Sequence, residues 1–351
     1  MAQRIVIMAG GTGGHVFPAL AVAQNLQQRG WQVSWLGTQA GLESRVIPAE
    51  NIEIDWLSVA GFRGKGLFAK ALVPFRVLLA SFQAFKVLRK RKPNIVLGMG
   101  GFVAGPGGAM AKLLGIPLVI HEQNRVPGTT NRLLSKIAVA VLEAFPQSFS
   151  ANVGAICTGN PLRKSLLTLA QKNIWQGERN LRILVLGGSQ GAQILNQVVP
   201  DVLAKLDGVD IFHQTGTVMQ DAVQQHYANL GVNVQVQAFI ADMQAAYTWA
   251  DMLICRVGAM TVSEVAAAGL PSIFIPLPQA IDDHQTANAQ VLVEAGAAVI
   301  LRQSDLDFKN LLEKIEQVQA NIVTMSRQAK QAARLDATEV VAEICISKAK
   351  A

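Results

Sequence analysis

The stretch IVIMAGGTGGHVFPALAVAQNL, residues 5–26, decides the fold of this chain. It begins as a continuous apolar strand, turns through a glycine-rich loop at 10–14, and continues as an apolar helix. This order is typical of a parallel sheet covered by helices. The N-terminus of a helix favours negative charge, so the loop is a candidate phosphate site. His15 stands at the edge of this loop.

Apolar strands and helical segments alternate along the rest of the chain. Strands that are apolar throughout are expected in parallel sheets buried on both faces. The halves open alike, with RIVIMAGGTGG at 4–14 and LRILVLGGSQG at 181–191, which predicts two doubly wound α/β domains. The candidate strands are 4–9, 32–37, 94–100, 117–122 and 138–145 in the first domain, and 181–188, 209–216, 232–240, 251–256 and 271–278 in the second.

We place the two domains at residues 1–163 and 164–340, with the polar stretch 168–180 as the linker. A terminal helix at about 325–348 is expected to pack back onto the first domain.

Composition narrows the class of protein. The chain has 351 residues, of which 50% are hydrophobic and 16% charged, enough for two packed cores. No apolar run approaches the roughly 20 residues that span a bilayer, and no signal sequence is expected. Three distant cysteines and scattered histidines match no disulfide or metal pattern, which indicates a reducing cytoplasm and no metal site. No other cofactor is expected.

The first glycine loop differs from the common nucleotide motifs. It lacks the Lys and Ser/Thr of a Walker loop, and Val16 stands where a dinucleotide fingerprint has its third glycine. No acid closes strand 32–37 to bind a ribose, which argues against a nicotinamide oxidoreductase. What remains is an anion-binding loop or a tight turn without a ligand.

Three further glycine-containing segments follow predicted strands. GMGGFVAGPGG at 98–108 could approach a ligand or be purely structural. GGSQGA at 187–192 is either a second phosphate loop, with Ser189 as a hydroxyl donor, or a strand–helix turn without a ligand. RVGAMTVSEVAAAGLP at 256–271 joins a strand to a helix that carries Glu264. This carboxylate either binds the two hydroxyls of a ribose or lies on the surface.

Polar residues gather where other predicted strands end. HEQN at 121–124 brings His121 and Glu122, either as an acid–base pair or as buried residues that fix the loop. GNPLR at 159–163 and DDHQTANA at 282–289 bring Arg163, His284 and Gln285 to similar positions.

The net charge of +7 is unevenly distributed. Residues 56–121 contain ten Lys or Arg and no Asp or Glu, and residues 66–93 mix these with Phe and Leu. An apolar surface with a basic rim suits an anionic membrane, although part of it is expected in the core. The segment has no base-stacking motif, so no nucleic acid is expected.

Taken together, these seven motifs resemble the MurG family, the undecaprenyl-diphospho-muramoylpentapeptide β-N-acetylglucosaminyltransferases of peptidoglycan synthesis. The resemblance covers residues 4 to about 340, with Arg125 and Val257 at positions where small residues are usual. It implies a GT-B fold: two Rossmann-like, doubly wound parallel-sheet domains facing across a cleft.

The resemblance also implies a set of binding residues. Ile240 would contact uracil through its backbone, and Glu264 would bind the ribose. The other groups would hold the diphosphate and sugar: Ser189 and the turn Ala259, Met260, Thr261, Val262 and Ser263 for the diphosphate; Asn124, Arg163 and Gln285 for the sugar; and Thr12, Gly13 and Gly14 from the other domain.

The implied reaction inverts the anomeric centre of UDP-GlcNAc as the muramoyl 4-hydroxyl of lipid I attacks it, giving lipid II. His15 is the candidate base, since an ordinary imidazole titrates near neutrality. Its alternative role is to bind substrate or hold the loop, with Glu122 as the alternative base. The implied place is the cytoplasmic face of the inner membrane, as a peripheral protein beside other cell-wall synthesis proteins. A sugar-nucleotide epimerase and a non-catalytic membrane scaffold are the rival interpretations.

Overall fold

The computed structural model describes residues 2–58, 73–188, 192–278 and 283–350. The chain divides into two compact units, one formed by residues 1–163 and 334–351 and the other by residues 164–333. The polypeptide therefore passes between the units twice, after Arg163 and after Ala333. Among the described helices, none is long and apolar enough to cross a bilayer.

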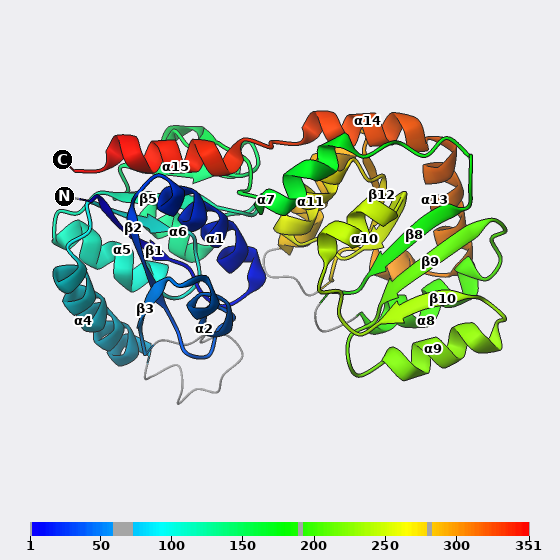
Figure 1. Cartoon of the computed structure of the whole chain (residues 1–351), viewed down its shortest axis with the longest axis horizontal. Coiled ribbons are helices and arrows are strands. Elements are labelled where there is room, and N and C mark those ends of the chain that lie inside the picture. The colour runs from blue at the N-terminus through cyan, green and yellow to red at the C-terminus, as the bar shows by residue number, and fades with distance from the viewer. Residues whose placement is uncertain (1, 59–72, 189–191, 279–282, 351) are drawn as a thin grey trace. The chain divides into compact units, whose positions relative to one another are not determined.

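The first unit is built on a parallel sheet (Figure 1). Within the described residues, this sheet has seven strands in the order β3-β2-β1-β4-β5-β6-β7. The strands are β1 (Arg4–Met8), β2 (Gln32–Gly37), β3 (Glu53–Trp56), β4 (Ile95–Gly98), β5 (Leu118–Glu122), β6 (Ala140–Glu143) and β7 (Ile156–Cys157). Its helices are α1 (Gly13–Gln28), α2 (Glu43–Val46), α4 (Val73–Arg91), α5 (Ala104–Leu113), α6 (Thr129–Leu134) and α15 (Ala337–Lys348).

Alternate residues of β1 point into two different cores, because side chains of a strand alternate between the faces of the sheet. Ile5 and Ile7 pack with α1 and α15, and Val6 and Met8 pack with α4 and α5. In Figure 1, α15 accordingly runs beside α1. The last helix of the chain is thus part of the core of the first unit.

The second unit repeats this plan. Its sheet, within the described residues, has six parallel strands in the order β10-β9-β8-β11-β12-β13. They are β8 (Leu181–Leu186), β9 (Val209–Gln214), β10 (Val234–Gln237), β11 (Met252–Cys255), β12 (Ser272–Phe274) and β13 (Ala298–Ile300). The helices are α7 (Lys164–Leu167), α8 (Gln193–Leu203), α9 (Gln220–Asn229), α10 (Met243–Trp249), α11 (Ala259–Ala268), α12 (His284–Glu294), α13 (Phe308–Ala320) and α14 (Ile322–Ala332).

The strand order reverses at one point in each sheet, between β1 and β4 in the first and between β8 and β11 in the second. Open parallel sheets bind ligands at such switch points, outside the carboxyl ends of the strands. The glycine loops at 10–14 and 98–108 follow β1 and β4, and those at 187–192 and 256–258 follow β8 and β11. Each pair of loops therefore flanks the expected ligand position of its own unit.

Two sequence predictions need correction. The single helix expected at 325–348 is two helices, since Ala333 is extended and α15 begins only at Ala337, with Asp336 as its N-cap residue. No glycine or proline marks this break, so helical periodicity alone could not reveal it. Strands β3, β7 and β13 were not predicted, because two of them are only two or three residues long and β3 alternates charged residues. All ten predicted strands are confirmed.

Candidate active site

A buried carboxylate holds the first glycine loop. Glu43 is fully buried and accepts hydrogen bonds from the backbone N–H of Gly11 at 2.9 Å and from the N–H and hydroxyl of Thr38 at 2.8 Å each. Gly10 leaves room for it, because a Cβ there would lie 2.6 Å from Glu43 Oε1. The loop then leads into α1, whose first N–H groups lack helical acceptors and can bind an anion.

The second glycine loop packs against the first. Gly101 has a φ of +78°, and a Cβ there would lie 2.5 Å from the carbonyl oxygen of Gly10. At Gly100, with a φ of +99°, a Cβ would lie 2.9 Å from Nδ1 of His15. Both positions require glycine for conformation and for space. Of the two roles left open by the sequence, the structural one is borne out for these two glycines.

His15 is hydrogen-bonded to the HEQN segment, which follows the carboxyl end of β5. Its Nδ1 lies 2.8 Å from Oε1 of Gln123, and Nε2 of Gln123 lies 3.0 Å from Nδ1 of His121. Nε2 of His121 in turn lies 2.9 Å from the carbonyl oxygen of Gly159. His15 is half-buried, whereas His121 and Gln123 are buried. Burial lowers the pKa of His121 to about 4, so this ring is neutral at physiological pH.

Glu122 has the surroundings of a loop-holding residue. It is 2% exposed, and its Oε1 accepts hydrogen bonds from the backbone N–H and side-chain amide of Asn124. Its Oε2 accepts from the N–H of Gly128 and the amide of Asn131. These four donors occupy the four acceptor positions of a carboxylate. Geometry therefore favours the loop-fixing role of Glu122 over that of a base.

The segment 159–163 joins this cluster. The amide of Asn160 donates to the carbonyl oxygen of Gln123 at 3.1 Å. The guanidinium of Arg163 lies 5.1 Å from the ring centroid of Phe17, which is two residues beyond His15 in α1. The structure thus brings Arg163 to the first turns of α1, together with the predicted residues Thr12, Gly13, Gly14 and His15.

In the second unit, the turn between β11 and α11 is pinned by two side chains. Arg256 donates to the carbonyl oxygens of Ile275 and Pro276 and, at 2.6 Å, to Gln303, and burial lowers its pKa. Oε1 of Gln285 accepts from the N–H of Val257 at 3.2 Å and from that of Leu277 at 2.9 Å. The predicted residues Ala259, Met260, Thr261, Val262 and Ser263 form the first turns of α11, after the extended cap Gly258.

Glu264 lies in the second turn of α11. Its Oε2 accepts a hydrogen bond from the hydroxyl of Tyr247 at 3.0 Å, and the carboxylate is half-buried. Ser263 donates back to the carbonyl oxygen of Ala259 in the same helix. Ile240 is buried, three residues after the end of β10. The predicted residue Ser189 lies outside the described residues.

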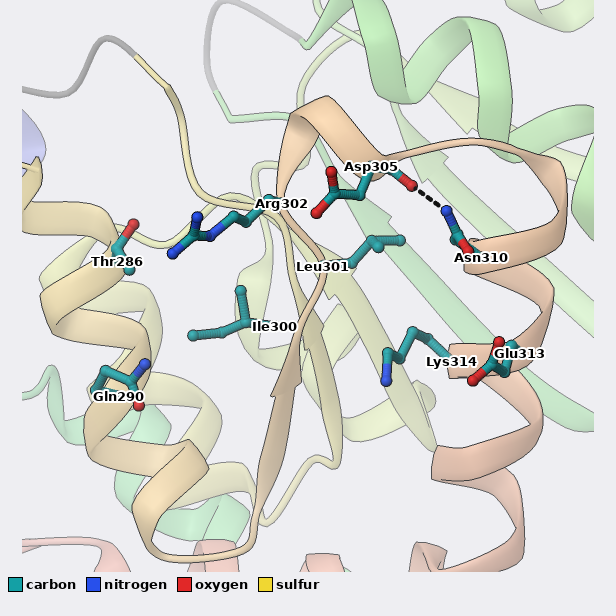
Figure 2. A pocket seen from close by; sticks show the side chains of 9 residues that line it. All are labelled: Thr286, Gln290, Ile300, Leu301, Arg302, Asp305, Asn310, Glu313 and Lys314. Carbon is teal, nitrogen blue, oxygen red and sulfur yellow. Dashed lines mark hydrogen bonds between the residues drawn. The ribbon is translucent and has the colours of Figure 1, made fainter.

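A separate pocket in the second unit contains none of the predicted site residues. It has a volume of about 530 Å³ and lies between α12, the end of β13 and α13 (Figure 2). Its charged side chains are of both signs: Arg302 and Lys314 with Asp305 and Glu313. Across the parts of the chain that the structure describes, no group of three or more His, Cys, Asp or Glu side chains could hold a metal ion.

Sequence reasoning missed three residues that shape these sites: Glu43, Gln123 and Tyr247. Glu43 and Tyr247 belong to no motif, and their partners are distant in sequence or in a different element. Gln123 lies inside HEQN, but only the fold shows that it reaches His15, 108 positions away.

Comparison with known proteins identifies the relatives of this chain. Residues 5–143 match the glycosyltransferase family 28 N-terminal domain, and residues 182–344 match the glycosyltransferase family 28 C-terminal domain. The UDP-N-acetylglucosamine–N-acetylmuramyl-(pentapeptide) pyrophosphoryl-undecaprenol N-acetylglucosamine transferase of Methylococcus capsulatus is 58% identical over 100% of both chains. The protein of the same name from Shewanella sp. strain MR-4 is 50% identical over 99% of this chain and 98% of its own.

Solved structures agree with these relatives. The crystal structure of Acinetobacter baumannii MurG covers 98% of this chain and 99% of its own, with a TM-score of 0.84 and 42% identity. The UDP-GlcNAc 2-epimerase of Neisseria meningitidis, bound to UDP-GlcNAc, has a TM-score of 0.68 over 98% of this chain and 100% of its own. It is only 14% identical, so that likeness concerns the fold alone.

With their two parallel sheets and paired glycine loops, these units define a two-domain glycosyltransferase of the GT-B fold. The expected fold class is thereby confirmed. The chain belongs to glycosyltransferase family 28 and, within it, to the MurG family.

Proposed function

We propose that this protein transfers GlcNAc from UDP-GlcNAc to the muramoyl 4-hydroxyl of lipid I, undecaprenyl-diphospho-MurNAc-pentapeptide, with inversion, and so makes lipid II. The observation that carries this proposal is the full-length, 58% identity to the Methylococcus capsulatus transferase named for these substrates. The roles given below to individual residues are part of this proposal.

The second unit, residues 164–333, binds the donor. Glu264 binds the ribose hydroxyls with Tyr247 holding its carboxylate, and Ile240 contacts uracil through its backbone. The first turns of α11 bind the diphosphate together with Ser189, since unpaired N–H groups at a helix N-terminus favour anions. Because Oε1 of Gln285 is engaged by two backbone N–H groups, its Nε2 is the end that contacts the sugar.

The first unit, residues 1–163 and 334–351, binds the acceptor and supplies the base. His15 takes the proton of the 4-hydroxyl while Thr12, Gly13 and Gly14 approach the diphosphate. The leaving UDP gains negative charge in the transition state, which Arg163 and the helix N-termini stabilise electrostatically. Asn124 contacts the sugar, and Glu122 keeps its loop in place.

A surface on α4 docks the protein on the membrane that carries the acceptor. Phe75, Leu78 and Phe82, spaced as one helical face, are 68%, 68% and 55% exposed. Lys86 and Arg89 continue this face, with Lys86 Nζ 4.4 Å from the centroid of Phe82. Ala80, Ala84 and Leu88 face the core instead. An exposed apolar stripe that ends in basic residues suits an anionic lipid surface.

The basic surface is smaller than the sequence suggests. Arg91 is paired with Glu53 and Asp55 of strand β3, so its charge is balanced within the unit. Three of the ten basic residues at 56–121, namely Arg63, Lys65 and Lys70, lie outside the described residues. The proposed docking surface is therefore the exposed face of α4. The membrane that it would bind is the inner membrane, at its cytoplasmic face.

The test is a screen of UDP-sugars with a lipid I analogue, with disaccharide product as the readout, for the wild type and His15→Asn. UDP-GlcNAc should be the preferred donor. The variant should lose about 10²–10⁴-fold in kcat, the usual contribution of a general base, while calorimetric binding of UDP-GlcNAc persists. Product from another UDP-sugar in preference would refute the donor assignment, and a kcat within a few-fold of wild type would refute the role of His15.

A further inference from the structure

Gln123 fixes the direction of the hydrogen-bond chain that ends at His15. Its Nε2 lies 3.2 Å from the carbonyl oxygen of His121 and 3.0 Å from Nδ1 of the same residue. A backbone carbonyl oxygen only accepts hydrogen bonds, so the group facing it must be the amide nitrogen. The amide oxygen of Gln123 consequently faces His15.

This orientation determines the proton positions on both rings. Oε1 of Gln123 can only accept, so Nδ1 of His15, 2.8 Å away, carries a proton. The carbonyl oxygen of Gly159 can only accept, so Nε2 of His121 carries a proton and its Nδ1 accepts from Gln123. Two independent backbone carbonyls thus give the same direction for the whole chain.

We propose that Gln123 is a positioning residue that holds His15 as the Nδ1–H tautomer and leaves the lone pair of His15 on Nε2 for the acceptor hydroxyl. The catalytic part of this inference rests on the proposed function, whereas the tautomer does not. In the reaction, the hydroxyl proton moves to Nε2 as the oxygen bonds the anomeric carbon and UDP leaves with the bonding electron pair. The imidazolium that forms keeps its Nδ1–H bond to Gln123.

Burial of the hydrogen-bond chain stabilises this direction of its hydrogen bonds. Gln123 is 1% exposed and His121 is 0% exposed, so water does not compete for these groups. A proton on Nδ1 of His121 would face the amide N–H group of Gln123 and force the amide to turn. The turned amide would present N–H groups to His15 and require the lone pair on Nδ1 instead. A neutral His121 therefore preserves the useful tautomer of His15.

The decisive measurement is the tautomer itself. Long-range ¹H–¹⁵N spectra of protein labelled in its histidines, at about pH 8.5 where an ordinary imidazole is neutral, distinguish the two tautomers. His15→Asn identifies the resonances of His15. We expect Nδ1–H for His15 and Nε2–H for His121 in the wild type. An Nε2–H tautomer of His15 would overturn the inference, whatever its effect on activity.

Two substitutions at position 123 distinguish the hydrogen bond of Gln123 to His15 from its hydrogen bond to His121. Gln123→Leu removes both partners, so His15 should lose its preference for Nδ1–H and kcat should fall by about 10–100-fold, as when orienting partners of metal-bound histidines are removed. Gln123→Glu keeps an acceptor for His15 and should retain Nδ1–H there. Gln28→Leu is the matched control. Gln28 is exposed at the far end of α1, the helix that contains His15, about 20 Å from that residue, so the substitution should change neither the tautomer of His15 nor kcat.

The outcomes distinguish this inference from the proposed function. If Gln123→Leu alters the tautomer but leaves kcat unchanged, the positioning role is confirmed and His15 is not the base. If Gln123→Leu keeps both the Nδ1–H tautomer and the wild-type kcat while His15→Asn is inactive, His15 remains the base and the role of Gln123 is refuted.

Discussion

The hydroxyl of Tyr247 donates a 3.0 Å hydrogen bond to Oε2 of Glu264, and it thereby connects α10 to α11 in the second unit. Tyr247 is buried, whereas Glu264 is half-buried. A buried donor fixes one carboxylate oxygen and directs the group as a whole. This arrangement suits a carboxylate that must meet two neighbouring hydroxyls at once, which a mobile surface glutamate would do less well.

Glu264→Ala should therefore weaken donor binding more than the chemical step. A hydrogen bond to a charged group is worth about 1.5–3 kcal/mol, so the KM for UDP-GlcNAc should rise roughly 10–100-fold. Steady-state kinetics with UDP-GlcNAc varied will measure this change. An unchanged KM would show that the ribose is bound elsewhere.

Tyr247→Phe tests the orienting bond separately. The ring still fills its buried site, so folding should be preserved, but the carboxylate loses a partner. We expect a smaller increase in the KM for UDP-GlcNAc, about 3–10-fold, with kcat nearly unchanged. The double variant with Glu264→Ala should be no worse than Glu264→Ala alone, because both changes act on one interaction. Additive effects would mean that Tyr247 acts independently of Glu264.

The sequence was sufficient to predict which loops lie at the ligand-binding ends of the strands. Continuous apolar strands and glycine turns are local signals, and the strand order of a doubly wound sheet then brings the loops together at its switch point. The partners of those loops were not predictable. Glu43 contacts Gly11, 32 positions away, and Gln123 contacts His15, 108 positions away. No periodicity encodes such contacts, since each depends on how distant strands are placed side by side.

In helix α4 the composition was evident from the sequence, but the side that faces the core was not. The mixture of apolar and basic residues at 66–93 was evident, but its division between core and surface was not. In the structure, Ala80, Ala84 and Leu88 fill the core at a spacing of four. Larger residues such as Phe75 and Leu78 remain exposed. Hydrophobicity alone would bury the larger residues first, so this inversion supports the docking surface proposed on α4.

Reversing Lys86, Arg89 and Lys90 to Glu should release the protein from anionic vesicles. Each basic residue near such a surface contributes about 1 kcal/mol, so three losses should weaken partitioning at least 100-fold at physiological salt. Activity on a soluble, short-chain acceptor should survive. The matched control reverses the exposed residues Lys205, Lys309 and Lys348, which produces the same net charge. Equal sedimentation of both triple variants with vesicles would refute docking through α4.

Glu43→Ala should destabilise the first unit. It removes the acceptor of the Gly11 N–H and of two Thr38 donors, at a cost of about 1–3 kcal/mol, and leaves a hollow beside Gly10. Urea denaturation should show this loss as a lower midpoint, and kcat should fall because the loop before α1 loosens. Glu50→Ala is the control. Glu50 is exposed, and its side chain accepts a hydrogen bond from the amide of Gln24, so the free energy of unfolding of this variant should stay within about 0.5 kcal/mol of the wild type. Equal midpoints for the two variants would show that Glu43 does not hold the loop.

The stability of the protein should fall as the pH drops below about 6.5, in part through His121. Burial lowers the pKa of this ring from 6.5 to about 4, so between these values the unfolded chain binds more protons than the folded one. The stabilisation is therefore complete above pH 6.5 and is lost on acidification, by roughly 2 kcal/mol between pH 7.5 and pH 5. Burial also lowers the pKa of His213 in the second unit, to about 3, and adds a similar loss. His121→Gln removes one of the two contributions, so its free energy of unfolding, measured with urea at both pH values, should fall by roughly 2 kcal/mol less than that of the wild type. His226→Gln, at a partly exposed position, should retain most of the wild-type slope. If His121→Gln and the wild type lose equal stability on acidification, the pKa of His121 is the same in the folded and the unfolded protein, and the lowered pKa assigned to the buried ring is refuted.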